Sequence, residues 1–380
     1  MKKSNISYDN ILDIDKLYYE YNKIRKNTRH KSKLINFNTK LNSNLCNILN
    51  VLEDKKYTHG KYNIFLIREK KYRLIMSEAI TDKIVNHLVS DYILSNILDN
   101  KLINTNIATR KNKGTLYGIN YLKKYIYTLK ENADTIYVLK MDIKKYFYNI
   151  DHKVLINLLK KIYTDKNIIN LLSDIIGSTN HNYVNITIDK IINNEIKKAK
   201  KMNISNGEKE KLIYELNTIP RIKQNVSLPI GNLTSQILAI FYLNDLDHFL
   251  KEKLNCKYYI RYMDDMIVLS DSNIFLKNVI IETKKFLKKY NVELNNKTQI
   301  YNLSDGINFL GYKFILTNKR LIIKINNNTK VRMLRNLKKY DKYKLYRSVA
   351  SYNGMLKIGN NKSWKYKINS MVVNMFYKNI

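Results

Sequence analysis

The chain has 380 residues, of which 44% are hydrophobic, and this composition predicts a globular protein with a buried core. It carries 68 Lys and Arg residues against 32 Asp and Glu, a formal net charge of +36, so a polyanion such as nucleic acid is the expected partner. The two cysteines lack CxxC spacing, which excludes a zinc cage or a disulfide framework, and no apolar run approaches the ~20 residues that span a bilayer, so we expect a cytoplasmic protein with no membrane partner.

The first half of the chain contains several predicted elements. Residues 1–61 alternate charged and apolar positions at helical spacing, which predicts a helical N-terminal extension. The stretch 62–76, YNIFLIREKKYRLIM, has two β-rich runs around the charged tip 68–71 and predicts a hairpin. An amphipathic helix should follow from about residue 78 to residue 98. The segment TIYVLKMD predicts a strand that ends in an acid, Asp142.

The second half begins with a polar, lysine-rich stretch near residues 178–224, which we interpret as a surface insertion without a predicted structure. Residues 231–254 predict a long helix, and KYYIRYMDDMIVLSD (257–271) predicts a β-hairpin. Residues 278–290 predict an amphipathic helix. The tail from about residue 326 is basic and has a helical pattern.

Asp264 and Asp265 fall at the turn of the predicted hairpin. Adjacent carboxylates repel each other unless cations neutralise them, which a divalent metal site would do. If the strand that ends in Asp142 is a neighbour in the same sheet, Asp142 and Asp264 converge on two ions, as an in-line phosphoryl displacement requires. Taken alone, an acidic pair in a turn is more often an ordinary solvated turn or cap. The surrounding motifs decide between these interpretations.

The tetrad Tyr262-Met263-Asp264-Asp265 resembles the YxDD box of reverse transcriptases. Five other motifs of that family occur in the same order, and they are a fingers hairpin with Arg73, the segment around Asp142, the stretch Gly231 to Gln236 (GNLTSQ), a Lys-Thr pair at Lys297, and Phe309-Leu310-Gly311-Tyr312. The resemblance implies an α+β fold, a right-hand polymerase whose palm has an antiparallel sheet plus helices. The implied domains are a helical N-terminal extension (1–61), fingers (62–134), a palm with the basic insertion near 178–224 (135–315) and a short helical thumb (316–380).

The resemblance also implies metal ligands. Asp142 and Asp264 would be the principal ligands of two Mg²⁺ ions, for which Mn²⁺ can substitute, with help from the backbone carbonyl of Ile143. Asp265 would be a third acid with a less direct contact. Lys297 lies where the family has a lysine proposed to protonate the departing pyrophosphate.

Further residues would contact the nucleotide and the primer. Phe147 would exclude a ribose 2′-hydroxyl by collision, although a core role beside Tyr146 and Tyr148 is the alternative. Arg73 resembles the fingers arginine that grips the triphosphate. The other candidates for the nucleotide site are Lys71, Arg110, Ile230, Gly231 and Gln236. The candidates for the primer grip are Phe309, Leu310, Gly311 and Tyr312, followed by a basic thumb on the duplex backbone.

The form IGNLTSQ resembles the enzymes of diversity-generating retroelements and some phage-defence reverse transcriptases. Retroviral and group II intron enzymes usually have Gln where Ile230 stands, and Ile230 can make only apolar contact, so we expect lowered fidelity. The sequence therefore predicts an RNA-directed DNA polymerase of a bacterial retroelement. Its expected partners are an RNA template, a DNA or RNA primer, deoxynucleotides and a small accessory protein.

Three other functions stay open on the sequence. The palm could be a non-catalytic RNA-binding scaffold, although the three intact acids argue against this. It could be an RNA-directed RNA polymerase, which uses a similar acidic hairpin. It could also be a defence enzyme with untemplated or protein-primed DNA synthesis, because 31 tyrosines offer many hydroxyl groups.

Overall fold

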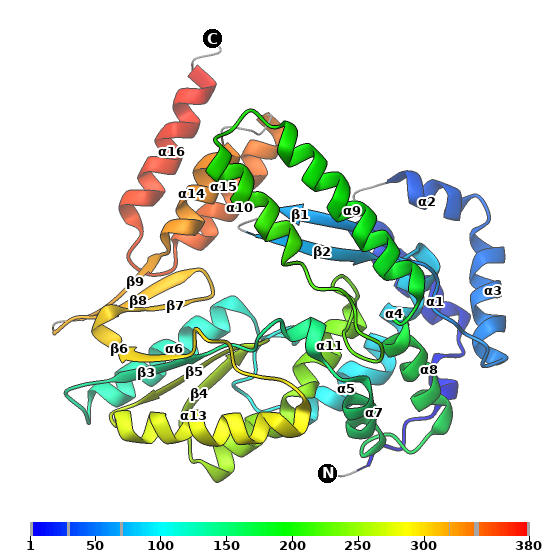
Figure 1. Cartoon of the computed structure of the whole chain (residues 1–380), viewed down its shortest axis with the longest axis horizontal. Helices are drawn as coiled ribbons and strands as arrows, with labels where there is room; N and C mark the ends of the chain where they lie inside the picture. The colour runs from blue at the N-terminus through cyan, green and yellow to red at the C-terminus, as the bar shows by residue number, and fades with distance from the viewer. Residues whose placement is uncertain (1–2, 29–30, 69–70, 319, 338–341, 378–380) are drawn as a thin grey trace.

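A computed structural model of the protein describes residues 3–28, 31–68, 71–318, 320–337 and 342–377. Among these residues, Figure 1 shows a four-stranded sheet at the base, a long β-hairpin with helices on one side and three C-terminal helices on the other. We name these parts the palm sheet, the fingers hairpin and the thumb helices, after the expected architecture. No helix within the described ranges is both long and apolar enough to cross a bilayer.

The N-terminal segment is helical, as predicted. Its α-helices are α1 (Ile14–Asn27), α2 (Lys31–Asn38) and α3 (Leu41–Glu53). Asp13 caps α1, because its side chain accepts hydrogen bonds from two backbone N–H groups in the first turn. Leu17, Tyr21 and Ile24 recur every three or four residues along α1 and are buried. They form the apolar stripe through which this helix packs on the rest of the chain.

The fingers hairpin is antiparallel, with Ile67 opposite Arg73. Residues 69–70 of its predicted basic tip lie outside the described residues. The elements of this region are β1 (Asn63–Arg68), β2 (Tyr72–Ser77), α4 (Ile80–Val89), a π-helical turn (Ser90–Ser95), α5 (Asn96–Leu98) and α6 (Thr115–Lys130). The predicted helix over 78–98 is therefore present, but a π-helical turn interrupts it.

The palm sheet places the predicted acidic strand beside the predicted acidic hairpin. In the described chain, its antiparallel strands lie in the order β4 (Tyr258–Tyr262), β5 (Asp265–Ser270), β3 (Tyr137–Met141) and β6 (Gln299–Asn302). Met141 at the end of β3 lies opposite Met266 on β5. The residue after β3 therefore lies beside the β4–β5 turn, as the sequence predicts.

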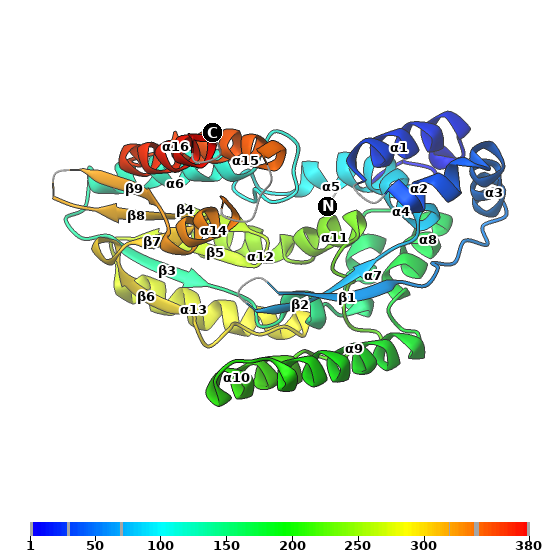
Figure 2. The same cartoon turned by 90° about the horizontal axis from the view of Figure 1, so that it is seen from above.

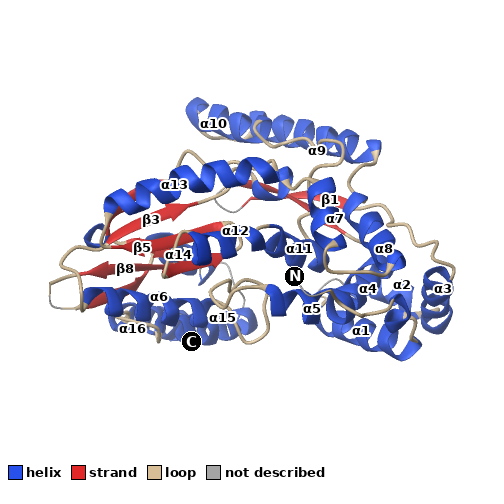
Figure 3. Cartoon of the chain, turned by 90° about the horizontal axis from the view of Figure 1, so that it is seen from below, coloured by secondary structure: helices blue, strands red, loops and turns tan. Residues whose placement is uncertain are grey.

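Both faces of the palm sheet are buried, by different helices. Leu139 and Val268 belong to one hydrophobic core, whereas their neighbours Val138 and Ile267 belong to another. Figure 3 shows α13 on one face of the sheet and α6 on the other. Helices of the first core include α11 (Leu233–Tyr242), α12 (Asn244–His248) and α13 (Asn273–Leu287). Because successive side chains of a strand point to opposite faces and both faces are covered, apolar residues occupy consecutive positions along these strands. The predicted long helix over 231–254 is divided at Leu243 into α11 and α12.

The predicted surface insertion forms a helical hairpin that covers the fingers. The insertion contains α9 (Asn182–Lys201) and α10 (Asn206–Asn217), and the helices α7 (His152–Lys160) and α8 (Lys166–Gly177) precede it. On α9, Val184, Ile188 and Ile192 recur every four residues and pack in one buried cluster with Ile64 and Leu74 of the fingers hairpin. Figure 2 shows α9 and α10 running along one edge of the molecule beside β1 and β2. The insertion is thus an ordered layer over the fingers.

The C-terminal part combines a small sheet with the thumb helices. Among the described residues the sheet contains β7 (Ile307–Phe309), β8 (Tyr312–Leu316) and β9 (Leu321–Ile325), and the helices are α14 (Asn327–Leu337), α15 (Lys342–Leu356) and α16 (Lys362–Tyr377). The helices agree with the predicted pattern. The predicted thumb boundary at residue 316 falls inside this sheet, because β9 pairs with β8.

Candidate active site

Two acidic residues come together where β3 ends and the β4–β5 hairpin turns. Asp142 follows β3 directly, and Asp265 opens β5 opposite Tyr262. Met263 and Asp264 form the turn between the strands, and Met263 has a left-handed backbone with φ of 55°. The Asp142 carboxyl group lies close enough to Asp264 to raise its pKa. The structure thus brings together the two acids that the sequence singled out as principal ligands.

The electrostatics of this cluster are unfavourable for three free carboxylates. Burial and the nearby Asp142 carboxylate raise the pKa of Asp264 to about 7. Burial also raises the pKa of Asp265, against the opposing effect of Lys140, whose Nζ lies 3.2 Å from Asp265 Oδ2. Asp265 Oδ1 is buried and has no hydrogen-bond partner in the described part of the chain. Protons or cations must therefore compensate these acids.

The available donors fit Mg²⁺ or Mn²⁺, which bind carboxylate and carbonyl oxygens. Asp142 and Asp264 could hold such ions between them, with the backbone carbonyl of Ile143, a residue that forms an isolated β-bridge with Leu294. Across the described ranges, no three His, Cys, Asp or Glu side chains surround a single point. Asp265 instead faces Lys140. The fit therefore rests on the Asp142–Asp264 pair.

Asn295 holds Asp142 in place, and sequence reasoning missed it. Its backbone N–H donates to the Asp142 carbonyl at 2.7 Å, and its side-chain Nδ2 donates to Asp142 Oδ2 at 3.1 Å. Lys297, in the same loop, donates its backbone N–H to Asn295 Oδ1 at 3.1 Å and exposes its side chain. In the Leu-Asn-Asn-Lys-Thr segment, the resemblance implies a role for the lysine alone. An amide two residues before that lysine was the missed signal.

Phe147 packs against the hydrophobic core beside Tyr146 and is only partly buried, so both roles that the sequence left open for it stay predictions. Tyr146 is the buried ring of the pair, and its hydroxyl donates to the Ala239 carbonyl. Phe147 is half-buried and packs edge-on against Tyr146, with 5.9 Å between the ring centroids. Its carbonyl accepts a hydrogen bond from Leu228 N–H at 2.8 Å, just before the GNLTSQ motif. The Phe147 ring is therefore anchored while part of it stays exposed.

The start of the GNLTSQ motif docks directly onto the fingers hairpin. The Met76 N–H donates to the Ile230 carbonyl at 3.0 Å. Gly231 has φ of 144°, and a Cβ there would lie 2.5 Å from the Met76 carbonyl oxygen, so only glycine fits this approach. Ile230 and Gln236 are both half-buried. The motif is thus a joint between β2 and α11.

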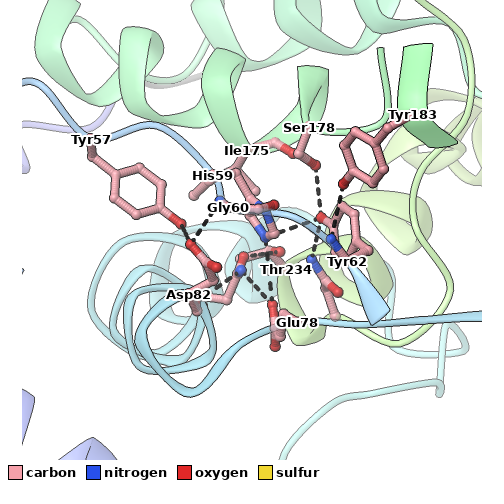
Figure 4. A network of polar contacts seen from close by, with 12 residues as sticks. Tyr57, His59, Gly60, Tyr62, Glu78, Asp82, Ile175, Ser178, Tyr183 and Thr234 are labelled. Atoms are coloured by element: carbon pink, nitrogen blue, oxygen red, sulfur yellow. Dashed lines mark hydrogen bonds and ion pairs between the residues drawn. The ribbon is translucent and has the colours of Figure 1, made fainter. Parts of the chain in front are cut away.

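A buried polar network reinforces this joint, and sequence reasoning gave its members no role (Figure 4). Asn232 Nδ2 donates to the Tyr62 hydroxyl at 3.0 Å, and the Thr234 hydroxyl donates to Asn86 Oδ1 at 2.6 Å. Asn86 Nδ2 in turn donates to Glu78 Oε2 at 2.6 Å. Asn232 and Thr234 are fully buried, so these partners satisfy the Asn232 amide N–H and the Thr234 hydroxyl, which would otherwise be costly to bury. These motif residues therefore fix α11 to the fingers.

A cleft of about 1360 Å³ opens between the fingers hairpin, the palm sheet and the thumb helices. Its basic lining residues are Arg68, Lys71, Arg73, Arg332 and Arg335. Tyr262 of the acidic hairpin also lines it, as do Leu310, Gly311 and Tyr312. The predicted triphosphate and primer residues from distant parts of the chain thus share one space. This cleft is wide and basic, as a bound nucleic acid requires.

The predicted primer grip forms a tight turn between β7 and β8. Leu310 and Gly311 have φ of 50° and 88°, the left-handed values that such a two-residue hairpin turn needs. The Tyr312 hydroxyl donates to the Met355 carbonyl at 3.0 Å and so ties the turn to α15. Phe309 is buried in the core and is not a lining residue of the cleft. Leu310, Gly311 and Tyr312 therefore line the cleft, and Phe309 does not.

Arg110 does not join the other predicted nucleotide residues. Its side chain is 6% exposed and forms an ion pair with Asp99. Its remaining donors bind the carbonyls of Ile103, Asn106 and Asp99 at 2.6, 2.9 and 3.0 Å. Arg110 is not a lining residue of the cleft, and its guanidinium binds its own loop, so its predicted contact with the nucleotide gains no support and stays a prediction.

Comparison with known proteins gives one family match and several more distant similarities. The model of the family described as reverse transcriptase (RNA-dependent DNA polymerase) matches residues 55–314. The chain is 27% identical over 203 residues to a putative COX1/OXI3 intron 2 protein of Saccharomyces cerevisiae, covering 47% of this chain and 24% of that protein. It is also 27% identical over 321 residues to a protein of Euglena longa named DNA-directed RNA polymerase subunit beta'', covering 75% of this chain and 38% of that one. The chain thus spans well under half the length of these relatives.

Among solved structures, the chain is similar to telomerase from Candida albicans in complex with a fragment of telomeric RNA. The TM-score is 0.43 at 15% sequence identity, and the match covers 73% of this chain and 46% of that one. At this level the similarity carries no argument about function.

The raised pKa of Asp264 predicts a pH-dependent stability. The ordinary pKa of an aspartate, 3.8, applies to Asp264 in the unfolded chain. In metal-free buffer between this pH and about 7, the folded protein therefore keeps a proton on Asp264 that the unfolded chain has already released. The free energy of unfolding should therefore fall as pH rises between 3.8 and about 7. Asp264→Asn should remove a part of that fall on the order of 1 kcal/mol or more. Urea denaturation in EDTA at about pH 5 and about pH 7.5 measures this difference.

An exposed acid provides the control. Asp134→Asn removes a solvent-exposed carboxylate and should leave the difference between the two pH values as in the wild type. An equal fall in wild type and Asp264→Asn would contradict the prediction.

Proposed function

The chain belongs to the reverse transcriptase (RNA-dependent DNA polymerase) family, whose model matches more than half of it, and we propose that it synthesises DNA on an RNA template. Family membership and the antiparallel palm sheet with its helices establish the α+β right-hand polymerase fold. One observation carries the proposed activity. Asp142 and Asp264 converge at the end of the hairpin whose Tyr262 lines the basic cleft between fingers and thumb.

The proposed reaction is an attack by the primer 3′-hydroxyl on the α-phosphate of a deoxynucleoside triphosphate. Two divalent ions held by Asp142, Asp264 and the Ile143 carbonyl would lower the pKa of that hydroxyl and stabilise the charge on the leaving pyrophosphate. Asn295 keeps the Asp142 carboxylate oriented for this contact. Arg73, exposed on β2 at the cleft, would bind the triphosphate.

Two more residues have proposed roles at the reacting groups. Phe147, anchored on Tyr146 and partly exposed, would collide with a 2′-hydroxyl and so select deoxynucleotides. Lys297 is exposed on the loop that holds Asp142 and would donate a proton to the pyrophosphate. The Leu310-Gly311 turn would hold the primer end in the cleft.

We further propose that the enzyme serves a retroelement of the diversity-generating type, with an RNA template and an accessory protein as partners. The support is the IGNLTSQ form of the motif, in which Ile230 offers only apolar contact beside the fingers. A defence-associated reverse transcriptase is the second candidate. The observation in its favour is the ordered α9–α10 hairpin, which departs from the shorter connection expected of the diversity-generating enzymes.

Primer extension tests the proposed activity. Purified protein with a DNA primer on poly(rA), dTTP and Mg²⁺ or Mn²⁺ should extend the primer, and Asp264→Ala should lower the rate at least about 10³-fold, because it removes a metal ligand. Asp134→Ala is the control for loss of an exposed acid. A wild-type protein that extends no primer with Mg²⁺ and none with Mn²⁺ would contradict the proposal. DNA synthesis without any template, or DNA bound covalently to the protein, would favour the defence candidate.

The same assay with UTP in place of dTTP separates a DNA polymerase from an RNA polymerase. Phe147→Ala should raise ribonucleotide use at least about 10-fold relative to deoxynucleotide use, because it removes the colliding ring. Equal use of both nucleotides by the wild type would exclude the steric role of Phe147.

Ile230→Gln tests the proposed low fidelity. A glutamine can hydrogen-bond the nucleotide or template and reject mispairs, so the misincorporation frequency should fall about 3-fold or more. Sequencing of extension products made on a mixed-sequence RNA measures that frequency. Identical error spectra in the two proteins would show that Ile230 does not set the fidelity.

A further inference from the structure

A charged pair is fully buried directly behind the catalytic turn. Arg261 on β4 and Asp247 on α12 are each 0% exposed. The Arg261 Nε donates to Asp247 Oδ1 at 2.7 Å, and its Nη2 donates to Oδ2 at 2.6 Å. This is the bidentate arrangement in which a guanidinium binds a carboxylate most strongly. The pair belongs to none of the motifs from which the function was proposed.

Stability alone is a weak explanation for such a pair. Removing two charges from water carries a large desolvation cost, and apolar residues of similar volume often serve a core as well or better. The buried guanidinium also forms hydrogen bonds beyond Asp247. Its remaining hydrogen bonds reach two backbone carbonyls, one in the catalytic turn and one in α11.

The first of these carbonyls belongs to the catalytic turn. The Arg261 Nη1 donates to the Met263 carbonyl at 2.8 Å. That carbonyl shares a peptide plane with the backbone N–H of Asp264, the next residue in the turn. Met263 is also the residue with φ of 55°, a conformation that a non-glycine side chain disfavours. Arg261 thus fixes the orientation of the peptide that presents Asp264.

The second carbonyl binds the guanidinium to α11, and two other side chains bind Asp247. Arg261 Nη2 also donates to the Ile240 carbonyl of α11 at 2.8 Å. Asp247 accepts further hydrogen bonds from the Tyr259 hydroxyl at 2.6 Å and from Asn106 Nδ2 at 3.2 Å. The backbone of Arg261 forms hydrogen bonds with the two neighbours of Asn106. Its N–H donates to the Thr105 carbonyl at 3.0 Å, and its carbonyl accepts from the Ile107 N–H at 3.1 Å. The guanidinium therefore has one available position, set by three separate segments of the chain.

We propose that Arg261 and Asp247 are positioning residues for the nucleotidyl transfer. Together they hold the Met263–Asp264 turn in the position that places the Asp264 carboxylate beside Asp142. This inference rests on the proposed polymerase function. Arg261 touches no reacting atom, so its effect is on the placement of a metal ligand. A displacement of that ligand by about 1 Å is enough to cost about 10²-fold in rate.

Two substitutions break the support in different ways. Arg261→Lys keeps the positive charge but lacks the planar fork that reaches Asp247 and Met263 together. The double variant Arg261→Met with Asp247→Leu removes both charges and leaves no uncompensated charge in the core, so it stays measurable if the lysine variant does not fold. The matched control is Tyr259→Phe, which deletes one donor to Asp247 and leaves the bond from Arg261 to Met263 in place.

The experiment measures primer extension on poly(rA) with dTTP, at temperatures where circular dichroism shows each variant folded. Both Arg261 variants should lower kcat about 10²-fold, change the KM for dTTP less than about 3-fold, and need a higher Mg²⁺ concentration for half-maximal rate. Tyr259→Phe should keep kcat and the Mg²⁺ dependence within about 3-fold of wild type even where its melting temperature falls.

The outcomes separate the inference from the function on which it rests. An inactive wild type overturns the proposed polymerase activity and the positioning role with it. An active wild type with unchanged kcat and Mg²⁺ dependence in a folded Arg261 variant overturns the positioning role alone. Equal losses in Tyr259→Phe and the Arg261 variants also overturn it, because they indicate a general effect of core damage.

Discussion

The mutual repulsion of Asp142 and Asp264 is the constraint on which the rest of the structure depends. Antiparallel pairing of β3 with β5 forces the two carboxyl groups together, and burial of both faces of the palm sheet prevents the strands from moving apart. The resulting pKa of about 7 at Asp264 shows the cost of this arrangement without cations. Divalent ions bound between the two acids would offset this cost, and this is the physical basis of the proposed phosphoryl transfer.

The neighbouring elements hold these acids and the substrate cleft in fixed positions. Asn295 binds Asp142 from the loop before β6, and Arg261 binds the turn that carries Asp264. On the other side, Gly231 and the buried hydrogen bonds of the GNLTSQ motif attach α11 to the fingers hairpin. Fingers, palm and thumb therefore share one cleft as a preorganised unit, and preorganised polar groups are the largest source of catalytic stabilisation in sites of this kind.

Local patterns explain why some of this could be predicted and some could not. The acidic strand and the acidic hairpin were predictable, because strand-forming runs and turn acids are adjacent in the sequence, and the YMDD tetrad linked them. The helices α9 and α10 are not predictable from the local sequence, because many lysines obscure the four-residue spacing of Val184, Ile188 and Ile192. Arg110 and Arg261 could not be told apart from the other basic residues, since their partners lie on other segments and burial leaves no local signal. The same holds for Asn295, whose role depends on a loop folding back onto Asp142.

Divalent-ion binding tests the central claim most directly. Mn²⁺ titration followed by electron paramagnetic resonance, with a dideoxy-terminated primer on poly(rA) and dTTP present, counts the ions bound by wild type, Asp264→Asn and the exposed control Asp134→Asn. We expect about two saturable Mn²⁺ ions in the wild type and in the control, and a clear loss of tight binding in Asp264→Asn. The same number and affinity of bound ions in all three proteins would contradict it.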